Sequence, residues 1–225
     1  MARRQSPQRP QRKGFPTGGW VERGRTGTRR DRTPFPINII TELEALMAAR
    51  KDLEKLFQKH GFSDFRWLDP QKIVVGQWVR LKCMFGCREY GKTATCPPNV
   101  PSVAECERFF REYRRAVVFH FVKKVAKPEA RFAWTRCVGL KLLKLEGEVF
   151  LSGHEKAFLL SMDSCSFCAE CSGARVTCKE PRLARPTSDA MAVDVFTTVR
   201  SLGYPIEVLS RYDQPMNRYA FLLID

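Results

Sequence analysis

Seven of the nine cysteines fall into two irregular segments, and this arrangement constrains the fold more than any other feature of the sequence. Residues 83–101 hold three cysteines and residues 163–186 hold four, and neither segment shows the apolar periodicity of a helix or strand. Long irregular segments inside a compact domain are usually functional or disordered. Cysteines without a ligand are normally scattered through the core. We therefore expect two metal-binding loops.

The second loop carries a closely spaced cysteine run that is typical of an iron–sulfur site. Two residues separate each of its first three cysteines and six precede the fourth; the set is Cys165, Cys168, Cys171 and Cys178. In a 4Fe-4S cluster each thiolate binds a different iron, and two-residue gaps let one loop reach neighbouring corners. The final gap is longer than that of bacterial ferredoxins, so the assignment of all four cysteines to one cluster is a hypothesis. Zinc is the alternative metal, although structural zinc sites usually use two C-x2-C pairs separated by a longer insert.

The first loop supplies three candidate ligands, Cys83, Cys87 and Cys96. Two further cysteines, Cys106 and Cys137, lie in register with apolar residues of expected helices, which indicates core positions. For Cys106 the alternative is a role as the fourth ligand of this site. A metal centre held by three cysteines has an open coordination position where a substrate could bind. A small thiol, a water molecule, or an Asp, Glu or His side chain from elsewhere in the chain would fill that position equally well.

The net charge of +15 is concentrated in the first 36 residues, which hold ten Lys or Arg and only two acidic residues. The same segment contains five prolines and five glycines but only six hydrophobic residues. It cannot bury enough apolar surface to offset its loss of chain entropy. We therefore expect a disordered basic arm over residues 1–36 and one folded domain over residues 37–225. Through such an arm the chain would bind nucleic acid only weakly and in a salt-sensitive way; a solvated tail is the simpler interpretation.

Periodic apolar patterns begin at residue 37 and alternate between helix and strand. Helices are predicted over residues 41–61, 102–115, 127–152 and from 187 or 188 to 202, with capping boxes at Thr41/Glu44 and Ser102/Glu105. Strands are predicted over residues 72–82, 116–122, 157–162, 206–209 and 219–224. The alternation predicts an α/β or α+β fold in which helices pack on a central mixed sheet. The order of the strands stays open.

Several classes of protein are disfavoured by what the sequence lacks. It has no apolar run long enough to cross a membrane and no secretory signal, so we expect a cytoplasmic protein with reduced cysteines. It also has no glycine-rich phosphate loop, dinucleotide fingerprint, serine-hydrolase elbow or zinc-protease motif.

The cysteine motifs resemble those of a family of predicted metal-binding proteins of bacteria and archaea to which no reaction is assigned. The matching segments are Cys83 and Cys87 with residues 90–92, Cys96 with its two following prolines, residues 153–158, the four-cysteine run with Pro181, residues 185–186, and residues 222–225. These segments lie between residues 83 and 225, and the resemblance as a whole covers roughly residues 37–225. The resemblance implies that the seven loop cysteines are candidate metal ligands, and it does not assign Cys106 or Cys137.

Three functions fit these features. The first is a cytoplasmic iron–sulfur protein with one or two 4Fe-4S clusters, which transfers electrons or acts as a redox accessory to a partner protein. The second is an enzyme in which the three-cysteine centre activates a substrate. The third is a zinc-stabilised binding module.

Overall fold

The computed structural model describes residues 39–225 apart from residues 128 and 212, and the expected basic arm over residues 1–36 lies outside the described residues. The strands are β1 (Phe65–Leu68), β2 (Ala116–Lys123), β3 (Phe158–Leu160) and β4 (Met216–Leu223). The α-helices are α1 (Ile39–Lys59), α2 (Gln77–Gly86), α3 (Val103–Arg111), α4 (Ala130–Leu151) and α5 (Val195–Ser201). Two short 3-10 helices are η1 (Pro70–Lys72) and η2 (Arg175–Thr177).

The four strands form one sheet in the order β1-β2-β4-β3, and all three strand pairings are antiparallel. The expected mixed sheet is therefore wrong in this respect, and the fold is of the α+β kind. The longest pairing joins β2 to β4 over eight residues each, with Val117 opposite Leu222. Because β2 and β4 are the two central strands, they connect the layers on both faces of the sheet.

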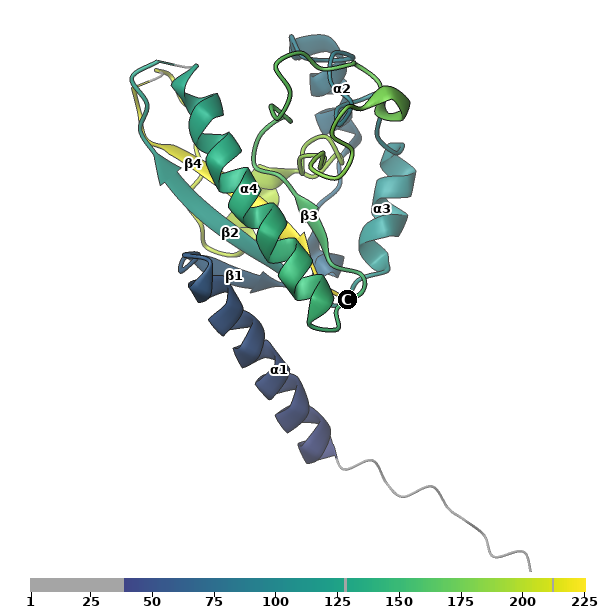
Figure 1. The fold of residues 1–225 in the computed structure, drawn as a ribbon, viewed down its shortest axis with the longest axis vertical. Helices are drawn as coiled ribbons and strands as arrows, with labels where there is room; N and C mark the ends of the chain where they lie inside the picture. Colours follow the sequence, from purple (N-terminus) through teal and green to yellow (C-terminus); the bar gives the residue numbers. More distant parts are fainter. Residues whose placement is uncertain (1–38, 128, 212) are drawn as a thin grey trace, which may run out of the picture.

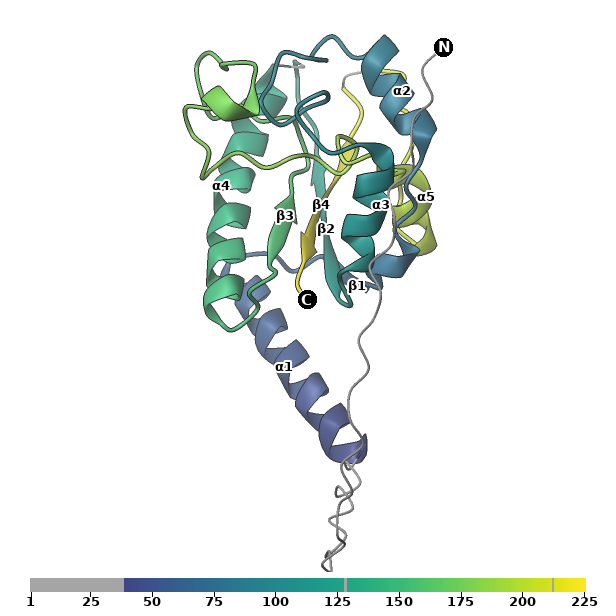
Figure 2. The same ribbon diagram turned by 90° about the vertical axis from the view of Figure 1, so that its right-hand side faces the viewer.

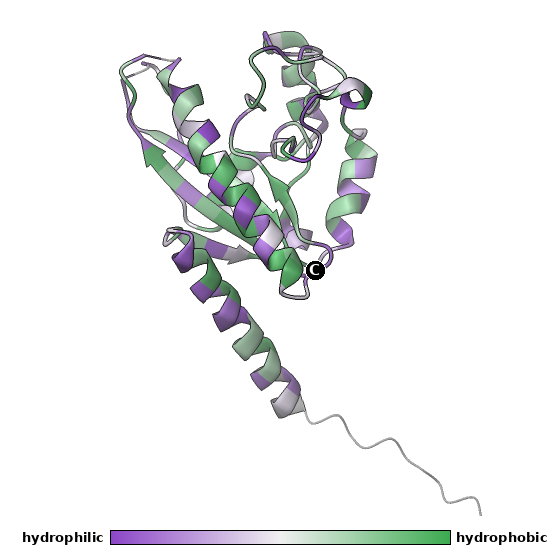
Figure 3. Ribbon diagram, in the orientation of Figure 1, coloured by the Kyte–Doolittle hydropathy of each residue, from purple (hydrophilic) through white to green (hydrophobic). Residues whose placement is uncertain are grey.

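Both faces of the sheet are covered by helices, which gives three layers (Figure 2). Val118 and Phe221 point to one face and pack in a core with α3 and α5, whereas Val117 and Leu222 point to the other and pack with α1 and α4. This explains why the central strands are apolar along most of their length (Figure 3). None of the described helices has the length and apolar content needed to cross a lipid bilayer.

Several predicted elements are confirmed. β2 spans the expected apolar run, and α3 begins with the predicted capping box, in which the hydroxyl of Ser102 accepts the backbone N–H of Glu105. The buried stripe of α4 includes Leu142 and Leu145, as its periodicity predicts. Helix α1 is also present, but it begins at Ile39, so Thr41 lies inside the helix rather than at its cap. Its first half projects away from the body (Figure 1).

The strand predicted over residues 72–82 is wrong, because most of this segment forms helix α2. Its single β contact is an isolated bridge between Val75 and Val193. Val79 is buried, whereas Trp78 and Leu81 are each 46% exposed, so the apolar residues of α2 do not form one buried strand face. The strand that does pair with β2 on this side is β1, only four residues long, which the periodicity analysis missed.

The C-terminal third also differs from expectation. α5 begins at Val195 and is capped by the carboxylate of Asp194, which accepts the backbone N–H of Thr197 at 3.0 Å. The hydroxyl of Thr187, one of the two expected caps, instead accepts the N–H of Ala190 and closes a turn. Residues 206–209 do not form a strand, because β2 and β3 already occupy both edges of β4.

Candidate metal centre

The four cysteines of the second loop line one small cavity. Cys165, Cys168, Cys171 and Cys178 surround a space of about 20 Å³ that is also bordered by Ala94 of the first loop. Cys171 is exposed, and the other three thiols are half-buried. The structure therefore brings together the four thiols that the sequence spacing groups in one set.

The second loop is held at its base and at its side. At the base, the N–H of Ser161, directly after β3, donates to the carbonyl oxygen of Pro186 at 2.8 Å, which brings the two ends of the loop together. At the side, the ring of Phe167 packs on α4 so closely that a Cβ at Gly139 would lie 3.4 Å from it. Phe167 is the residue before Cys168, so this contact positions the cysteine run against α4.

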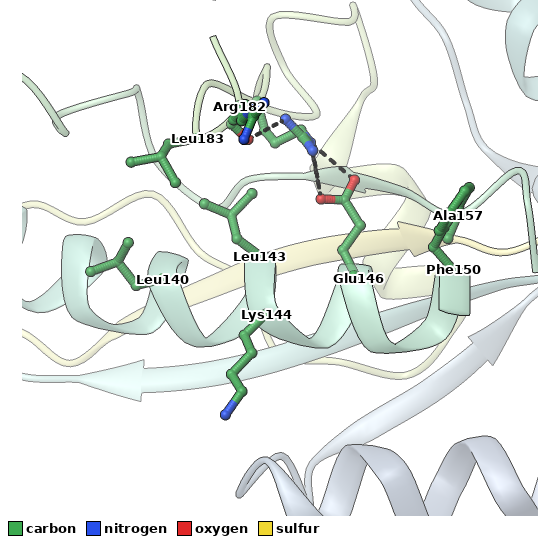
Figure 4. A pocket seen from close by; sticks show the side chains of 10 residues that line it. Leu140, Leu143, Lys144, Glu146, Phe150, Ala157, Arg182 and Leu183 are labelled. Carbon is green, nitrogen blue, oxygen red and sulfur yellow. Dashed lines mark hydrogen bonds and ion pairs between the residues drawn. The ribbon is translucent and has the colours of Figure 1, made fainter. Parts of the chain in front are cut away.

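An ion pair between Glu146 and Arg185 holds the C-terminal end of the same loop on α4 (Figure 4). Two nitrogens of Arg185 lie 2.9 Å from the carboxylate oxygens, and one of those oxygens also accepts the N–H of Leu159 in β3 at 2.8 Å. The pair borders a surface groove of about 550 Å³, toward which Leu140 and Leu143 also point (Figure 4). Because the groove's carboxylate is already paired, we assign the Glu146–Arg185 pair a structural role.

The three cysteines of the first loop line a second, larger cavity. Cys83 lies in the last turn of α2, and Cys87 caps that helix by donating its N–H to the carbonyl oxygen of Cys83 at 3.3 Å. Cys96 lies further along the same loop, and all three cysteines border a cavity of about 190 Å³. Three acidic residues, Glu89, Asp163 and Asp189, line the same cavity. The structure thus adds carboxylates to the three thiols, and those of Asp163 and Asp189 come from segments that the spacing of the first three cysteines could not identify.

The thiols and carboxylates of the first cavity favour a bound cation, whereas Arg131 and Arg218, which also border it, oppose one. The pKa of Cys83 is raised to about 11, chiefly by burial and then by the nearby carboxylate of Asp189. Negative charge on Cys87 and Cys96 raises this pKa further, and Arg80 opposes the effect. Several thiolates beside a carboxylate repel one another, so a metal ion would stabilise their charged forms.

The four-cysteine cavity shows the same pattern. Burial raises the pKa of Cys165, and a backbone hydrogen bond at Phe167 partly offsets this rise. Negative charge on the other three cysteines of the set raises the pKa further. Within the part of the chain that the structure describes, no three His, Cys, Asp or Glu side chains are already arranged to hold one metal ion. Metal binding therefore requires the thiols to lose their protons and to rearrange.

The two cysteine loops lie against each other. The side-chain amide of Asn99 donates to the carbonyl oxygen of Thr93 in its own loop at 3.1 Å and to that of Gly173 in the other loop at 2.8 Å. The pKa of Cys96, raised chiefly by burial, is raised further by charge on Cys165, so the two thiols are close enough to interact electrostatically. The two candidate centres are therefore neighbours.

The remaining two cysteines lie outside both cavities. Cys106 is fully buried in the core on the α3 side, as its helical register predicts, and its sulfur lies 4.0 Å from that of Met191. Cys137 is exposed, so its predicted core position is wrong. The buried face of α4 carries Thr135 and Leu142, and Cys137 lies off this face.

Two arginines at the first cavity were also missed by the sequence analysis. Arg131 lies in the first turn of α4 and Arg218 lies in β4, and both border the cavity that contains the three cysteines. The Nε atom of Arg131 lies 2.7 Å from a carboxylate oxygen of Asp163. No sequence signal connects these residues to the cysteines, because their elements are separated by long stretches of chain.

Comparison with known proteins gives one match. Residues 66–224 match the family described as predicted metal-binding protein (DUF2284), and the matched region includes all seven cysteines of the two loops. No curated protein and no solved structure matches the chain. Since the match covers more than half of the sequence, the chain belongs to this family of predicted metal-binding proteins.

Proposed function

We propose that this chain is a cytoplasmic iron–sulfur protein with two neighbouring 4Fe-4S centres, which exchanges electrons with a partner protein. One centre would be held by Cys165, Cys168, Cys171 and Cys178 and the other by Cys83, Cys87 and Cys96. One observation carries the proposal: the seven cysteines selected by spacing line two adjacent cavities. The other two cysteines lie elsewhere in the fold.

The residues of the second loop fit an iron–sulfur cluster better than a zinc ion on the pattern of their gaps. Three cysteines at consecutive two-residue intervals suit the corners of a cubane, whereas zinc sites usually draw ligands from two separate pairs. The cavity of about 20 Å³ holds roughly one water-sized sphere, so a cluster requires the loop to widen. The exposed position of Cys171 leaves that side of the loop free to do so.

An iron–sulfur cluster supplies one-electron transfer, and the protein supplies ligands, distance and shielding. The half-buried thiols Cys83, Cys96 and Cys165 would limit the access of water to the metal. Asn99 holds the two loops together, which keeps the two candidate centres close. Lys179 and Glu180 both border the four-cysteine cavity, and Lys179 would offset part of the negative charge of a cluster bound there.

One observation favours the enzyme as a second candidate function. The cavity at the three cysteines is about 190 Å³, far larger than the space inside the four-cysteine set. A centre with three thiolate ligands would leave one coordination position facing this cavity, where either Asp189 or a substrate could bind.

Anaerobic purification followed by iron, sulfide and zinc analysis tests the proposal. We expect a brown protein that contains iron and acid-labile sulfide and absorbs broadly in the visible range. A colourless protein with stoichiometric zinc that is stable in air would refute both redox functions and support the zinc-stabilised module.

Cysteine variants test the ligand assignment. Cys96→Ser and Cys168→Ser should each lose roughly half of the iron, because a serine hydroxyl keeps its proton at neutral pH and binds iron poorly. Cys137→Ser and Cys106→Ser are matched controls, at an exposed and a buried position, and both should retain the full metal content. If the controls lose as much iron as the loop variants, the assignment of ligands is wrong.

A further inference from the structure

Three arginines line a cavity that lies beside the first cysteine set. Arg131 comes from the first turn of α4, Arg218 from β4, and Arg211 from the segment before β4. The cavity has a volume of about 260 Å³, and no Asp or Glu is among the described residues that line it. α4 and β4 begin at the same end of the molecule (Figure 1). The cavity is therefore positively charged at its wall.

Arg218 is the arginine of this cavity whose side chain has no direct ion pair. Arg131 lies 2.7 Å from Asp163, and Arg211 lies 3.1 Å from Asp213. The side chain of Arg218 forms no hydrogen bond or ion pair with any described residue, and Asp163 and Asp189 attract its charge only at longer range. Burial lowers the pKa of Arg218, because the charged guanidinium is poorly solvated there. An arginine nevertheless stays protonated in proteins. A partly desolvated charge of this kind is costly unless an anion accompanies it.

The start of α4 adds to the positive potential. The helix has 22 residues, and its first turn contains Arg131 but no acidic residue. The N-terminal end of a helix carries partial positive charge from its unpaired N–H groups, so a cation placed there is unfavourable. Glu129 stands at the N-cap position, but its side chain forms no capping hydrogen bond. An anion bound between Arg131 and Arg218 would relieve this accumulation of positive charge.

The same two arginines border the cavity of the three cysteines. Arg131 and Arg218 line both the cavity of about 260 Å³ and the cavity of about 190 Å³ that contains Cys83, Cys87 and Cys96. A ligand held by these guanidinium groups would therefore lie next to the candidate metal ligands. The cavity of about 260 Å³ is also lined by the apolar side chains of Val125, Leu209 and Met216.

We propose that this cavity binds a small organic anion whose carboxylate or phosphate group contacts Arg131 and Arg218. Guanidinium groups recognise both oxyanions through paired N–H···O hydrogen bonds. The apolar part of the ligand would pack on Val125, Leu209 and Met216. Binding itself depends only on these protein groups, whereas a role of the ligand at the three-cysteine centre rests on the proposed function.

Calorimetric titration of the full chain at constant ionic strength tests the binding site. The probes are inorganic phosphate, butyl phosphate and butyrate, with butanol as the uncharged control. We expect saturable binding of one butyl phosphate or butyrate molecule, tighter than that of inorganic phosphate, and no binding of butanol. The two organic probes also show which oxyanion the site prefers. Absence of saturable binding for all three anions would refute the proposal.

Arginine variants test the assignment of the contact. Arg218→Met should weaken binding at least about tenfold, and Arg218→Lys should weaken it less because the charge is kept. Arg108→Met, at an exposed position of α3, is the matched control for loss of one positive charge and should bind as the parent protein does. Equal affinity in Arg218→Met and Arg108→Met would overturn the proposal, and circular dichroism would verify that each variant is folded.

Metal analysis of the same samples separates this proposal from the proposed function. Anion binding that persists in Cys96→Ser, after metal is lost from the first set, shows an arginine site that is independent of the metal. If the parent protein contains zinc only but binds butyrate in an Arg218-dependent way, the proposed function is wrong and the anion site stands. If the parent protein contains iron but binds no anion, the anion site is wrong and the proposed function stands. Where iron is present, a change in the electron paramagnetic resonance signal of one centre on adding butyrate would place the ligand beside it.

Discussion

The ion pair between Glu146 and Arg185 should stabilise both the fold and the second cysteine loop. Glu146 is 5% exposed, and its carboxylate binds Arg185 and the N–H of Leu159 at the same time. Arg185 directly precedes Pro186, whose carbonyl oxygen closes the base of the loop through Ser161. Loss of the charge on Glu146 should therefore destabilise both the core and the loop that carries the second cysteine set.

The structure allows the size of the effect to be worked out for Glu146→Gln. Removing one member of a buried ion pair costs about 3–5 kcal/mol. The glutamine oxygen can still accept from Leu159, and the side chain of Arg185 is 22% exposed, so water recovers part of the loss. We therefore expect Glu146→Gln to lower the free energy of unfolding by about 2–3 kcal/mol. In a chain of this size such a cost corresponds to a fall in Tm of roughly 4–12 °C.

Thermal unfolding of preparations with the same metal content measures this effect. Glu148→Gln is the matched control, since it lies two residues along the same helix and its carboxylate is more exposed, at 27%. It pairs with Lys59, whose side chain is 69% exposed, and lies 3.2 Å from Nε2 of His60, to which the glutamine oxygen can still bond. That substitution should destabilise the fold clearly less than Glu146→Gln does. Arg185→Met and the double variant complete a double-mutant cycle. In this cycle the coupling energy between Glu146 and Arg185 should exceed about 1 kcal/mol.

Transfer of metal to a chelator provides the second measurement. The Glu146→Gln variant should release metal from the second cysteine set faster than the parent protein, because the end of the loop is no longer held on α4. The reasoning is refuted if Glu146→Gln loses no more stability than Glu148→Gln, or if the cycle shows no coupling between Glu146 and Arg185.

Three further predictions follow from other contacts. Asn99→Ala removes the side-chain link between the cysteine loops, which should cost about 1–3 kcal/mol and speed metal release; unchanged metal release would show that other contacts hold the loops together. A hydrogen bond from Arg115 lowers the pKa of Asp225 in the folded protein. The contact with Arg115 therefore stabilises the fold fully above the ordinary Asp pKa of about 3.9, and this stabilisation is lost as the pH falls through the lower pKa of the folded state. Asp225→Asn should therefore flatten the dependence of unfolding free energy on pH in the acid range, and an unchanged slope in urea titrations would contradict this. Deletion of residues 1–36 removes eight of the fifteen net positive charges but none of the seven loop cysteines, so metal content should not change while any nucleic-acid binding weakens; loss of metal would show that the arm contributes to a centre.

The elements that were predicted correctly are those whose signals lie between near neighbours in the sequence. The capping box of α3 needs only Ser102 and Glu105, and the buried face of α4 repeats at the helical period. The apolar run of β2 marks a strand that is buried on both faces. Such patterns can be read from one sequence, because the residues that create them are a few positions apart.

The elements that were predicted wrongly depend on distant neighbours. Residues 72–82 are rich in β-branched residues and include Trp78, yet most of them form α2, where Trp78 is 46% exposed. β propensity describes how well side chains pack against a neighbouring strand, and here no strand lies alongside. The core position predicted for Cys137 is wrong for a similar reason, because periodicity alone does not show which side of α4 faces the sheet.

The candidate site divides in the same way. The sequence by itself determined the two cysteine sets, since gaps of two to eight residues keep the thiols of a loop within reach of one another. Only the tertiary structure decided that the two loops touch through Asn99 and that Asp189 and Arg218 border the three-cysteine cavity. These contacts join residues separated by tens of positions or more, and the packing of helices and loops around the sheet brings them together.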